Sequence, residues 1–256
     1  MAKLRSSLPS LLALCMIFGV WELFVHVTDQ PAYILPPLSS IVETAIVLAA
    51  DRLLPAAWVT LQEMLMGFGI GVVVGLALGT LIHFSVLLRQ GLLPLVIGSQ
   101  AIPVIAIAPL LILWFGFGMT PKVIVAALVA FFPVVVNTVS GLAAVDRDMI
   151  RLMDSLGATK RQIYCKVYLP ASLPFIFAGV KNAAAISAIG AIVGEWVGAH
   201  EGLGPVMIAA IAGFKTTVVF AAILYLAIMA VGLFLLVSLV ERLVMPWHFL
   251  ADERGK

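Results

Sequence analysis

Long apolar runs separated by short polar connections make up most of the sequence. Six runs reach the length of about 20 mostly apolar residues that a helix needs to cross about 30 Å of hydrocarbon. These runs cover residues 8–27, 61–84, 92–115, 123–144, 173–197 and 218–240. The pattern predicts an all-α, polytopic membrane protein with about six transmembrane helices and both chain termini on one side of the membrane.

Composition excludes an ordinary soluble domain. Hydrophobic residues make up 63% of the 256 positions and charged residues 11%, against roughly 45–50% and 25% in soluble domains. The first run follows Lys3 and Arg5 as a signal peptide would, but it continues to about Val27 without a small-x-small cleavage site, so we read it as an uncleaved span. The net charge of +2 does not suggest a nucleic-acid partner, and Cys15 and Cys165 are expected to be free thiols.

The predicted orientation follows from the positive-inside rule. With the N-terminus inside, 12 of the 15 Lys and Arg residues lie at the inner side, counting Lys181 near the inner end of the fifth run. Only Arg52, Lys122 and Lys215 lie outside. The chain is therefore predicted to be N-in and C-in. We divide it into an N-terminal span with an outer segment (1–60), a core (61–245) and a cytoplasmic tail (246–256).

The outer segment contains Pro36 and Pro37, which exclude a helix at that point. Ser39 or Ser40 is expected to cap a short interfacial helix over residues 41–54. In the second run, Gly67, Gly71, Gly75 and Gly79 follow one another every four residues and form a smooth helical stripe. Such a stripe permits close helix packing in lipid, either fixed within the subunit or sliding during gating.

Three prolines interrupt the third run, at positions 94, 103 and 109, and predict a helix that is kinked or locally unwound near mid-membrane. Broken helices with nearby polar groups often line the path of a transported solute. The candidates for that path are Gln100, Pro103, Asn137, Asn182, Ser187 and Glu195. Alternatively, the amides form hydrogen bonds between helices. Glu195 lies near the outer end of its run and is expected to be solvated at the interface.

The polar segment 146–174 is the one long interruption of the apolar pattern, and it carries five basic residues. Apolar residues recur at helical spacing up to Leu156, and Gly157 suits the left-handed turn after a helix end. Thr159 and Gln162 form a capping-box pattern for a second short helix that ends at Leu169 and Pro170. A simple connection between two spans needs only a handful of residues, and residues 146–174 are much longer than that. The segment is therefore expected to dock a partner protein or to lie on lipid headgroups.

The same segment resembles the cytoplasmic loop of binding-protein-dependent ABC importer permeases. The pattern of that family is EAA, three residues, Gly, nine residues and Ile-x-Leu-Pro; here Gly157 is followed nine residues later by Val167, Tyr168, Leu169 and Pro170. Arg151, Leu152 and Met153 occupy the EAA positions. The runs LPPLSSIV, SQAIPVIAIAPLLILWFGFG, FFPVVVNTVSGL, GEW and GLG are similar to the branch that handles sulfonates, taurine, nitrate and vitamin precursors such as pyrimidines or riboflavin.

The resemblance implies a type I ABC importer permease fold in the bacterial inner membrane, embedded in lipid. It also implies a permease homodimer, a pair of ATPase subunits that hold ATP-Mg, and an external solute-binding protein. The chain itself lacks a GxxxxGK[ST] phosphate loop and a metal-ligand cluster, so we expect no enzymatic activity and no bound cofactor or metal. The residues expected to contact the ATPase in the coupling loop (146–172) are Arg151, Leu152, Met153, Leu156, Gly157, Ala158, Lys160, Arg161, Val167, Leu169 and Pro170.

The expected function is therefore ATP-driven uptake of a small polar or anionic solute. An ion-coupled secondary transporter is the alternative, but it usually needs ionisable groups at mid-membrane. In this sequence the spans carry mainly amides and hydroxyls at depth, with Glu22, Glu63 and Glu195 nearer their ends. A structural subunit without transport activity is a further alternative.

Overall fold

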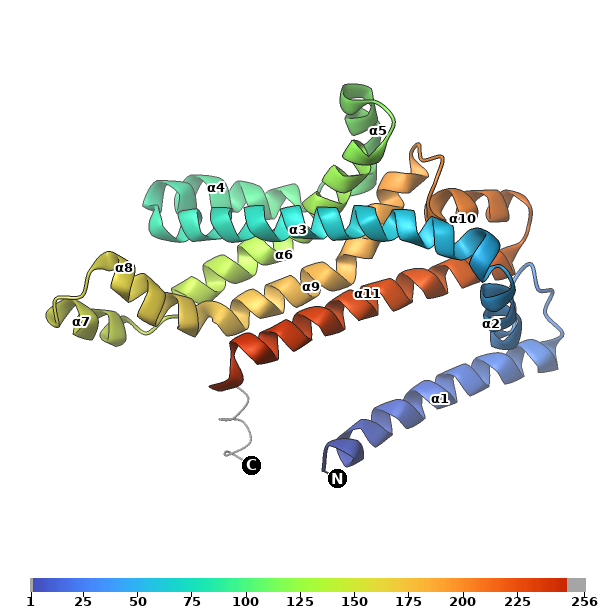
Figure 1. Cartoon of the computed structure of the whole chain (residues 1–256), viewed down its shortest axis with the longest axis horizontal. Coiled ribbons are helices and arrows are strands. Elements are labelled where there is room, and N and C mark those ends of the chain that lie inside the picture. The colour runs from blue at the N-terminus through green and yellow to red at the C-terminus, as the bar shows by residue number, and fades with distance from the viewer. Residues whose placement is uncertain (1, 248–256) are drawn as a thin grey trace. The chain divides into compact units, whose positions relative to one another are not determined.

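The computed structural model describes residues 2–247, and that part of the chain is helical with no β-strand (Figure 1). Its elements are α1 (Ala2–Thr28), α2 (Leu38–Val47), the π-helical turn η1 (Ala49–Leu53), α3 (Leu54–Phe84), α4 (Val86–Ser99), α5 (Val104–Phe115), α6 (Met119–Ala143), α7 (Arg147–Ser155), α8 (Lys160–Ile163), the π-helical turn η2 (Tyr164–Tyr168), α9 (Leu169–Trp196), α10 (Leu203–Ala212) and α11 (Thr216–Val244). The all-α prediction is confirmed. Of the predicted tail (246–256), residues 248–256 lie outside the described residues.

Four stretches of the described chain are long and apolar enough to cross a membrane: Ala49–Phe84, Met119–Ala143, Lys160–Trp196 and Thr216–Val244. They coincide, to within one residue at their ends, with or extend beyond the second, fourth, fifth and sixth predicted runs. The first run lies within α1, whose apolar part Leu12–Thr28 is shorter. The third run is not one straight span, because α4 and α5 are bent by 98° at the residues between them. Counted together, α4 and α5 make a fifth candidate span.

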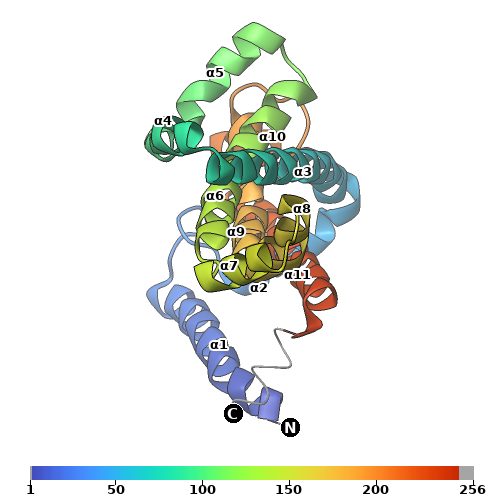
Figure 2. The same ribbon diagram turned by 90° about the vertical axis from the view of Figure 1, so that its left-hand side faces the viewer.

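The break between α4 and α5 occurs at one of the three prolines of the third run. Pro103 begins α5 in an extended conformation, whereas Pro94 and Pro109 are accommodated inside helices. Proline lacks the amide hydrogen needed to continue a helix, and residues 100–102 turn back on the last carbonyls of α4. The predicted local unwinding is therefore confirmed and assigned to Pro103. Figure 2 shows α5 leaving the direction of α4 at this point.

Contacts divide the chain into two compact units, Met1–Val59 with His200–Leu226, and Thr60–Ala199 with Ala227–Lys256. In the first unit, Glu22 of α1 caps the N-terminus of α2. Its carboxylate accepts hydrogen bonds from the Leu38 amide at 2.6 Å and from the Ser39 hydroxyl at 2.7 Å. The prediction that a serine caps this helix was wrong: Ser39 lies inside α2, and the more strongly accepting carboxylate takes the capping role.

Further contacts join distant parts of the first unit. The Trp21 indole donates to the Pro36 carbonyl at 3.2 Å and packs edge-on against Phe220. The Thr216 hydroxyl donates to the Tyr33 carbonyl at 2.6 Å. These side chains tie the irregular segment before α2 to α1 and α11.

The second unit is built on α6 and α9, which lie side by side in both views (Figures 1 and 2). Small residues allow the close approach of these helices. A Cβ atom added to Gly179 of α9 would lie 2.6 Å from the Asn137 Cβ, and one added to Gly190 would lie 2.7 Å from the Ala126 Cα. Both distances are too short for real carbon atoms, so the interface requires glycine at these positions.

The glycine stripe of α3 lies against the same helix α6. A Cβ added to Gly71 would meet the Ala127 carbonyl oxygen at 2.8 Å, and one added to Gly75 would meet the Val134 Cβ at 2.8 Å. Gly67 and Gly79 are equally close to α6. The stripe therefore packs within one subunit, as the first of the two predicted roles requires.

Candidate functional site

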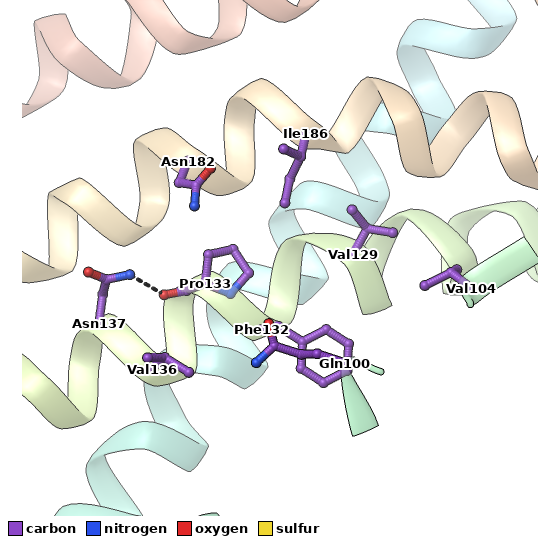
Figure 3. A pocket seen from close by; sticks show the side chains of 9 residues that line it. All are labelled: Gln100, Val104, Val129, Phe132, Pro133, Val136, Asn137, Asn182 and Ile186. Atoms are coloured by element: carbon purple, nitrogen blue, oxygen red, sulfur yellow. Dashed lines mark hydrogen bonds between the residues drawn. The ribbon is translucent and has the colours of Figure 1, made fainter. Parts of the chain in front are cut away.

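A hollow of about 380 Å³ opens beside the break between α4 and α5, and we call it the amide hollow (Figure 3). It brings together three of the six residues that the sequence indicates for the solute path. Gln100 comes from the break, Asn137 from α6 and Asn182 from α9. The lining consists of Gln100, Val104, Val129, Phe132, Pro133, Val136, Asn137, Asn182 and Ile186.

One of the three amides is held in place. The Asn137 side-chain nitrogen donates to the Pro133 carbonyl at 2.8 Å, one turn earlier on α6 (Figure 3). Gln100 and Asn182 are exposed and make no side-chain hydrogen bond to any other residue in the range 2–247. The hollow therefore offers two amides whose hydrogen-bonding groups are available and a third whose orientation is fixed.

The other three candidates lie elsewhere. Pro103 is exposed at the start of α5 and does not line the hollow. Ser187 is fully buried and donates back to the Ala184 carbonyl at 2.9 Å, within its own helix. Glu195 is 1% exposed, so the expectation that interfacial water solvates it was wrong.

Glu195 belongs to a buried polar cluster that joins three helices. Its carboxylate accepts a hydrogen bond from the Thr60 hydroxyl of α3 at 2.6 Å. Nearby, the Lys122 ammonium of α6 forms an ion pair with Glu63 of α3 at 2.7 Å, and Glu63 also interacts electrostatically with Glu195. The Lys122 ammonium offsets the charge of Glu63, and the carboxylate of Glu195 has the Thr60 hydroxyl as a hydrogen-bond donor.

Sequence reasoning placed Lys122 in an outer connection, and its assignment to a connection was wrong because α6 begins earlier, at Met119. The residue lies inside α6 and is 7% exposed. Its partner is 59 positions away in the sequence, so no local pattern indicated the pair. Lys181 of α9 also has a distant partner, because its ammonium bonds to Glu241 of α11 at 2.7 Å.

The coupling loop folds as predicted into a helix, a glycine turn and a second helix. Asp146 caps α7 by accepting from the Asp148 amide at 2.8 Å. Gly157 then adopts φ +73°, a left-handed conformation that favours glycine. Thr159 and Gln162 form the reciprocal capping box of α8.

The predicted end of the second helix at Leu169 and Pro170 was wrong. The chain continues from α8 through η2 into α9 as one stretch, Lys160–Trp196. Pro170 lacks an amide hydrogen and its ring would clash with the carbonyl four residues earlier in a regular helix. The wider π-helical turn directly before it, Tyr164–Tyr168, provides the room that proline requires.

One face of α7 is apolar and is exposed within residues 2–247. None of the residues of α7 is buried, and the side chains of Met149, Leu152 and Leu156 are 53%, 55% and 72% exposed. Arg151, at the first EAA position, forms an exposed ion pair with Asp148 at 3.1 Å. Exposed apolar groups flanked by charges are typical of a protein-binding surface.

A second hollow, of about 630 Å³, lies beside the coupling loop, and we call it the loop hollow. Its lining includes three aromatic residues, of which Phe84 contacts the other two. The ring centroid of Phe84 lies 5.8 Å from that of Tyr164 and 5.3 Å from that of Tyr168. The lining consists of Thr80, Phe84, Ile150, Asp154, Lys160, Arg161, Ile163, Tyr164 and Tyr168. Polar and aromatic groups thus surround a space beside α7, on the side of the helix that carries Ile150 and Asp154.

Comparisons with known proteins agree on one protein family. Residues 71–246 match the family described as "Binding-protein-dependent transport system inner membrane component". The chain is 34% identical to the formylaminopyrimidine transport permease protein ThiX of Halalkalibacterium halodurans, over 97% of this chain and 99% of that protein. It is 38% identical to the riboflavin transport system permease protein RibX of Chloroflexus aurantiacus, over 94% and 90%.

The fold is also similar to a solved structure. A chain of the MetNI methionine ABC transporter in an inward-facing conformation superposes with a TM-score of 0.65 at 22% identity, covering 75% of this chain and 95% of that one. The shared fold and the extent of the sequence matches agree with the coupling-loop pattern around Gly157. The chain belongs to the binding-protein-dependent ABC transporter permeases, which are multi-pass proteins of the bacterial inner membrane and not enzymes.

Proposed function

We propose that this chain is the translocation subunit of an ATP-driven importer for a small polar or anionic solute. The range of solutes covers sulfonates, taurine, nitrate and pyrimidine- or riboflavin-type vitamin precursors. Two partners supply what this chain lacks: a pair of ATPase subunits that hold ATP-Mg, and an external solute-binding protein. The observation that carries the proposal is the ordered coupling loop with an exposed apolar face.

The coupling loop transmits ATPase motion through its direct connection to α9. Because Lys160–Trp196 is continuous, a displacement of α8 moves a helix that lines the amide hollow. Asn182 lies on α9 itself, and α9 packs against α6, which carries Asn137. Movement of the loop therefore changes the spacing of residues around the solute path, which is the requirement for alternating access.

A homodimer completes the proposed path. The side chains of Gln100 and Asn182, which line the amide hollow, are exposed in the single chain. A second copy of the chain would enclose a cavity between the two subunits. The binding protein would deliver the solute to its outer mouth, and surrounding lipid would cover the exposed apolar helix faces.

One observation favours an ion-coupled secondary transporter, namely the buried carboxylates Glu63 and Glu195. Ionisable groups inside a membrane often carry coupling ions. Here, however, Glu63 is bonded to Lys122 and Glu195 to Thr60. A carboxylate that is already bonded to an ammonium group serves helix association directly, so we keep ATP-driven import as the proposal.

The docking role predicts that Arg161→Glu and Gly157→Val reduce copurification of the ATPase with the permease by at least about tenfold, as expected for the loss of roughly 1.4 kcal/mol. Arg161 is exposed beside the loop hollow, and valine at φ +73° costs about 1–2 kcal/mol. Copurification from detergent-solubilised membranes measures the effect.

Two variants serve as controls for the docking experiment. Gly157→Asn retains access to the left-handed conformation and is expected to bind the ATPase normally. Arg52→Glu reverses a charge outside the coupling loop and is expected to have no effect. Normal ATPase binding by both Arg161→Glu and Gly157→Val would contradict the assigned docking site.

A further inference from the structure

The amide hollow has a chemical character that narrows the class of solute. Each carboxamide of Gln100, Asn137 and Asn182 supplies hydrogen-bond donors on nitrogen and an acceptor on oxygen. The bond from Asn137 to the Pro133 carbonyl uses one donor hydrogen and leaves the Asn137 side-chain oxygen available as an acceptor. Such paired donors and acceptors match the edge of a heterocycle that carries ring nitrogens, carbonyls or amino groups.

The rest of the lining is apolar and includes a flat surface. Phe132 and Gln100 both belong to the lining (Figure 3). An aromatic ring provides a stacking surface for a planar solute, and the remaining walls are aliphatic. A volume of about 380 Å³ falls within the roughly 300–1,000 Å³ of ordinary small-molecule sites. The hollow therefore combines one aromatic side chain with three carboxamides in its lining.

No charge is available in the hollow to bind an anion. None of the nine described residues that line it is ionisable. Two lysines lie in the membrane helices that border it, and both are already paired, Lys122 with Glu63 at 2.7 Å and Lys181 with Glu241 at 2.7 Å. A sulfonate entering this space would lose water without gaining a cationic partner, which is strongly unfavourable.

From this arrangement, and resting on the transport function proposed above, we propose that the amide hollow binds a neutral, planar, hydrogen-bonding heterocycle and discriminates against sulfonates and other anions. The carboxamides of Gln100 and Asn182 contact the polar edge of the solute, and Phe132 contacts its face. Specificity then resides partly in the permease, in addition to the external binding protein.

The test measures binding of radiolabelled cytosine, uracil and ethanesulfonate to the purified permease–ATPase complex by equilibrium dialysis. Cytosine or uracil is expected to bind, and ethanesulfonate is expected to bind at least about tenfold more weakly. Gln100→Ala and Asn182→Ala are each expected to weaken heterocycle binding about five- to tenfold, the effect of one net hydrogen bond. Ser187→Ala, on the same helix but outside the hollow, is the matched control and is expected to leave binding unchanged.

A charge-insertion variant gives the two solute classes opposite responses. Asn182→Lys is expected to weaken binding of cytosine and to raise binding of ethanesulfonate, because it supplies the missing cation. Tighter binding of ethanesulfonate than of either heterocycle to the unmodified complex would overturn the inference, as would binding of neither class to a complex that still hydrolyses ATP.

ATP-driven uptake by the same complex, reconstituted in proteoliposomes with the external binding protein, distinguishes an error in the solute class from an error in the import function. If ethanesulfonate binds and is taken up with ATP, the proposed import function stands and the solute class is wrong. If neither the heterocycles nor ethanesulfonate is taken up in an ATP-dependent manner, the import function itself fails.

Discussion

Replacing Lys122 with methionine is expected to destabilise the folded protein by about 3–5 kcal/mol, because it leaves a buried carboxylate without its cation. Glu63 is 1% exposed and its carboxylate lies 2.7 Å from the Lys122 ammonium. Methionine fills a similar volume, so the loss is chiefly electrostatic. Unfolding in detergent–lipid mixed micelles, followed by circular dichroism as denaturant is added, measures the change in free energy.

Two further variants distinguish the effect of losing the ion pair from a general loss of stability. Lys215→Met removes an exposed lysine and is expected to change stability by less than about 0.5 kcal/mol. Adding Glu63→Gln to Lys122→Met removes the orphaned charge and is expected to recover most of the loss. If Lys122→Met alone is as stable as the unmodified protein, the assignment of a buried ion pair between α3 and α6 is wrong.

The second large effect is expected at the glycine stripe of α3. Gly71→Val should destabilise the protein by about 1–3 kcal/mol, the usual cost of overpacking a close interface. A Cβ at this position would lie 2.8 Å from both the Ala127 carbonyl oxygen and the Ala130 Cβ, and backbone atoms on α6 have little freedom to move away. The same denaturant titration in mixed micelles measures the change.

Gly69→Val is the matched control, because Gly69 lies on the same helix and has no atom within 4 Å of an added Cβ. Both variants change helix propensity equally, so their difference reports packing alone. Equal stability of Gly71→Val and Gly69→Val would show that α3 does not approach α6 as closely as the structure indicates.

Features with a local sequence signal were predictable. The apolar runs predict the long helices because a segment in lipid must satisfy its own backbone hydrogen bonds, as an α-helix does. Gly157 and the Thr159–Gln162 pair predict the shape of the coupling loop, since helix ends depend on neighbouring residues. The amides Gln100, Asn137 and Asn182 were correctly singled out as polar groups in apolar runs, although only the three-dimensional structure shows that they share one hollow.

Features that depend on distant partners were not predictable from one sequence. In the sequence, Lys122 resembles an ordinary loop lysine. Only the folded structure shows that Glu63 of α3 lies 2.7 Å from it. The serines near α2 read as caps, but Glu22, 16 positions before Leu38, occupies that place. The π-helical turn before Pro170 replaces the helix end that proline usually indicates. In each case the tertiary contact or the backbone geometry overrides the local preference.

The measurement that tests the account most directly is solute uptake into proteoliposomes that contain the permease and its ATPase pair, with the external binding protein present. One set of vesicles encloses ATP-Mg, and a second set lacks ATP but carries imposed proton and sodium gradients. Radiolabelled heterocycles and sulfonates serve as probes. The account predicts uptake only with enclosed ATP, and its loss in Arg161→Glu; robust uptake driven by an ion gradient without ATP would contradict it.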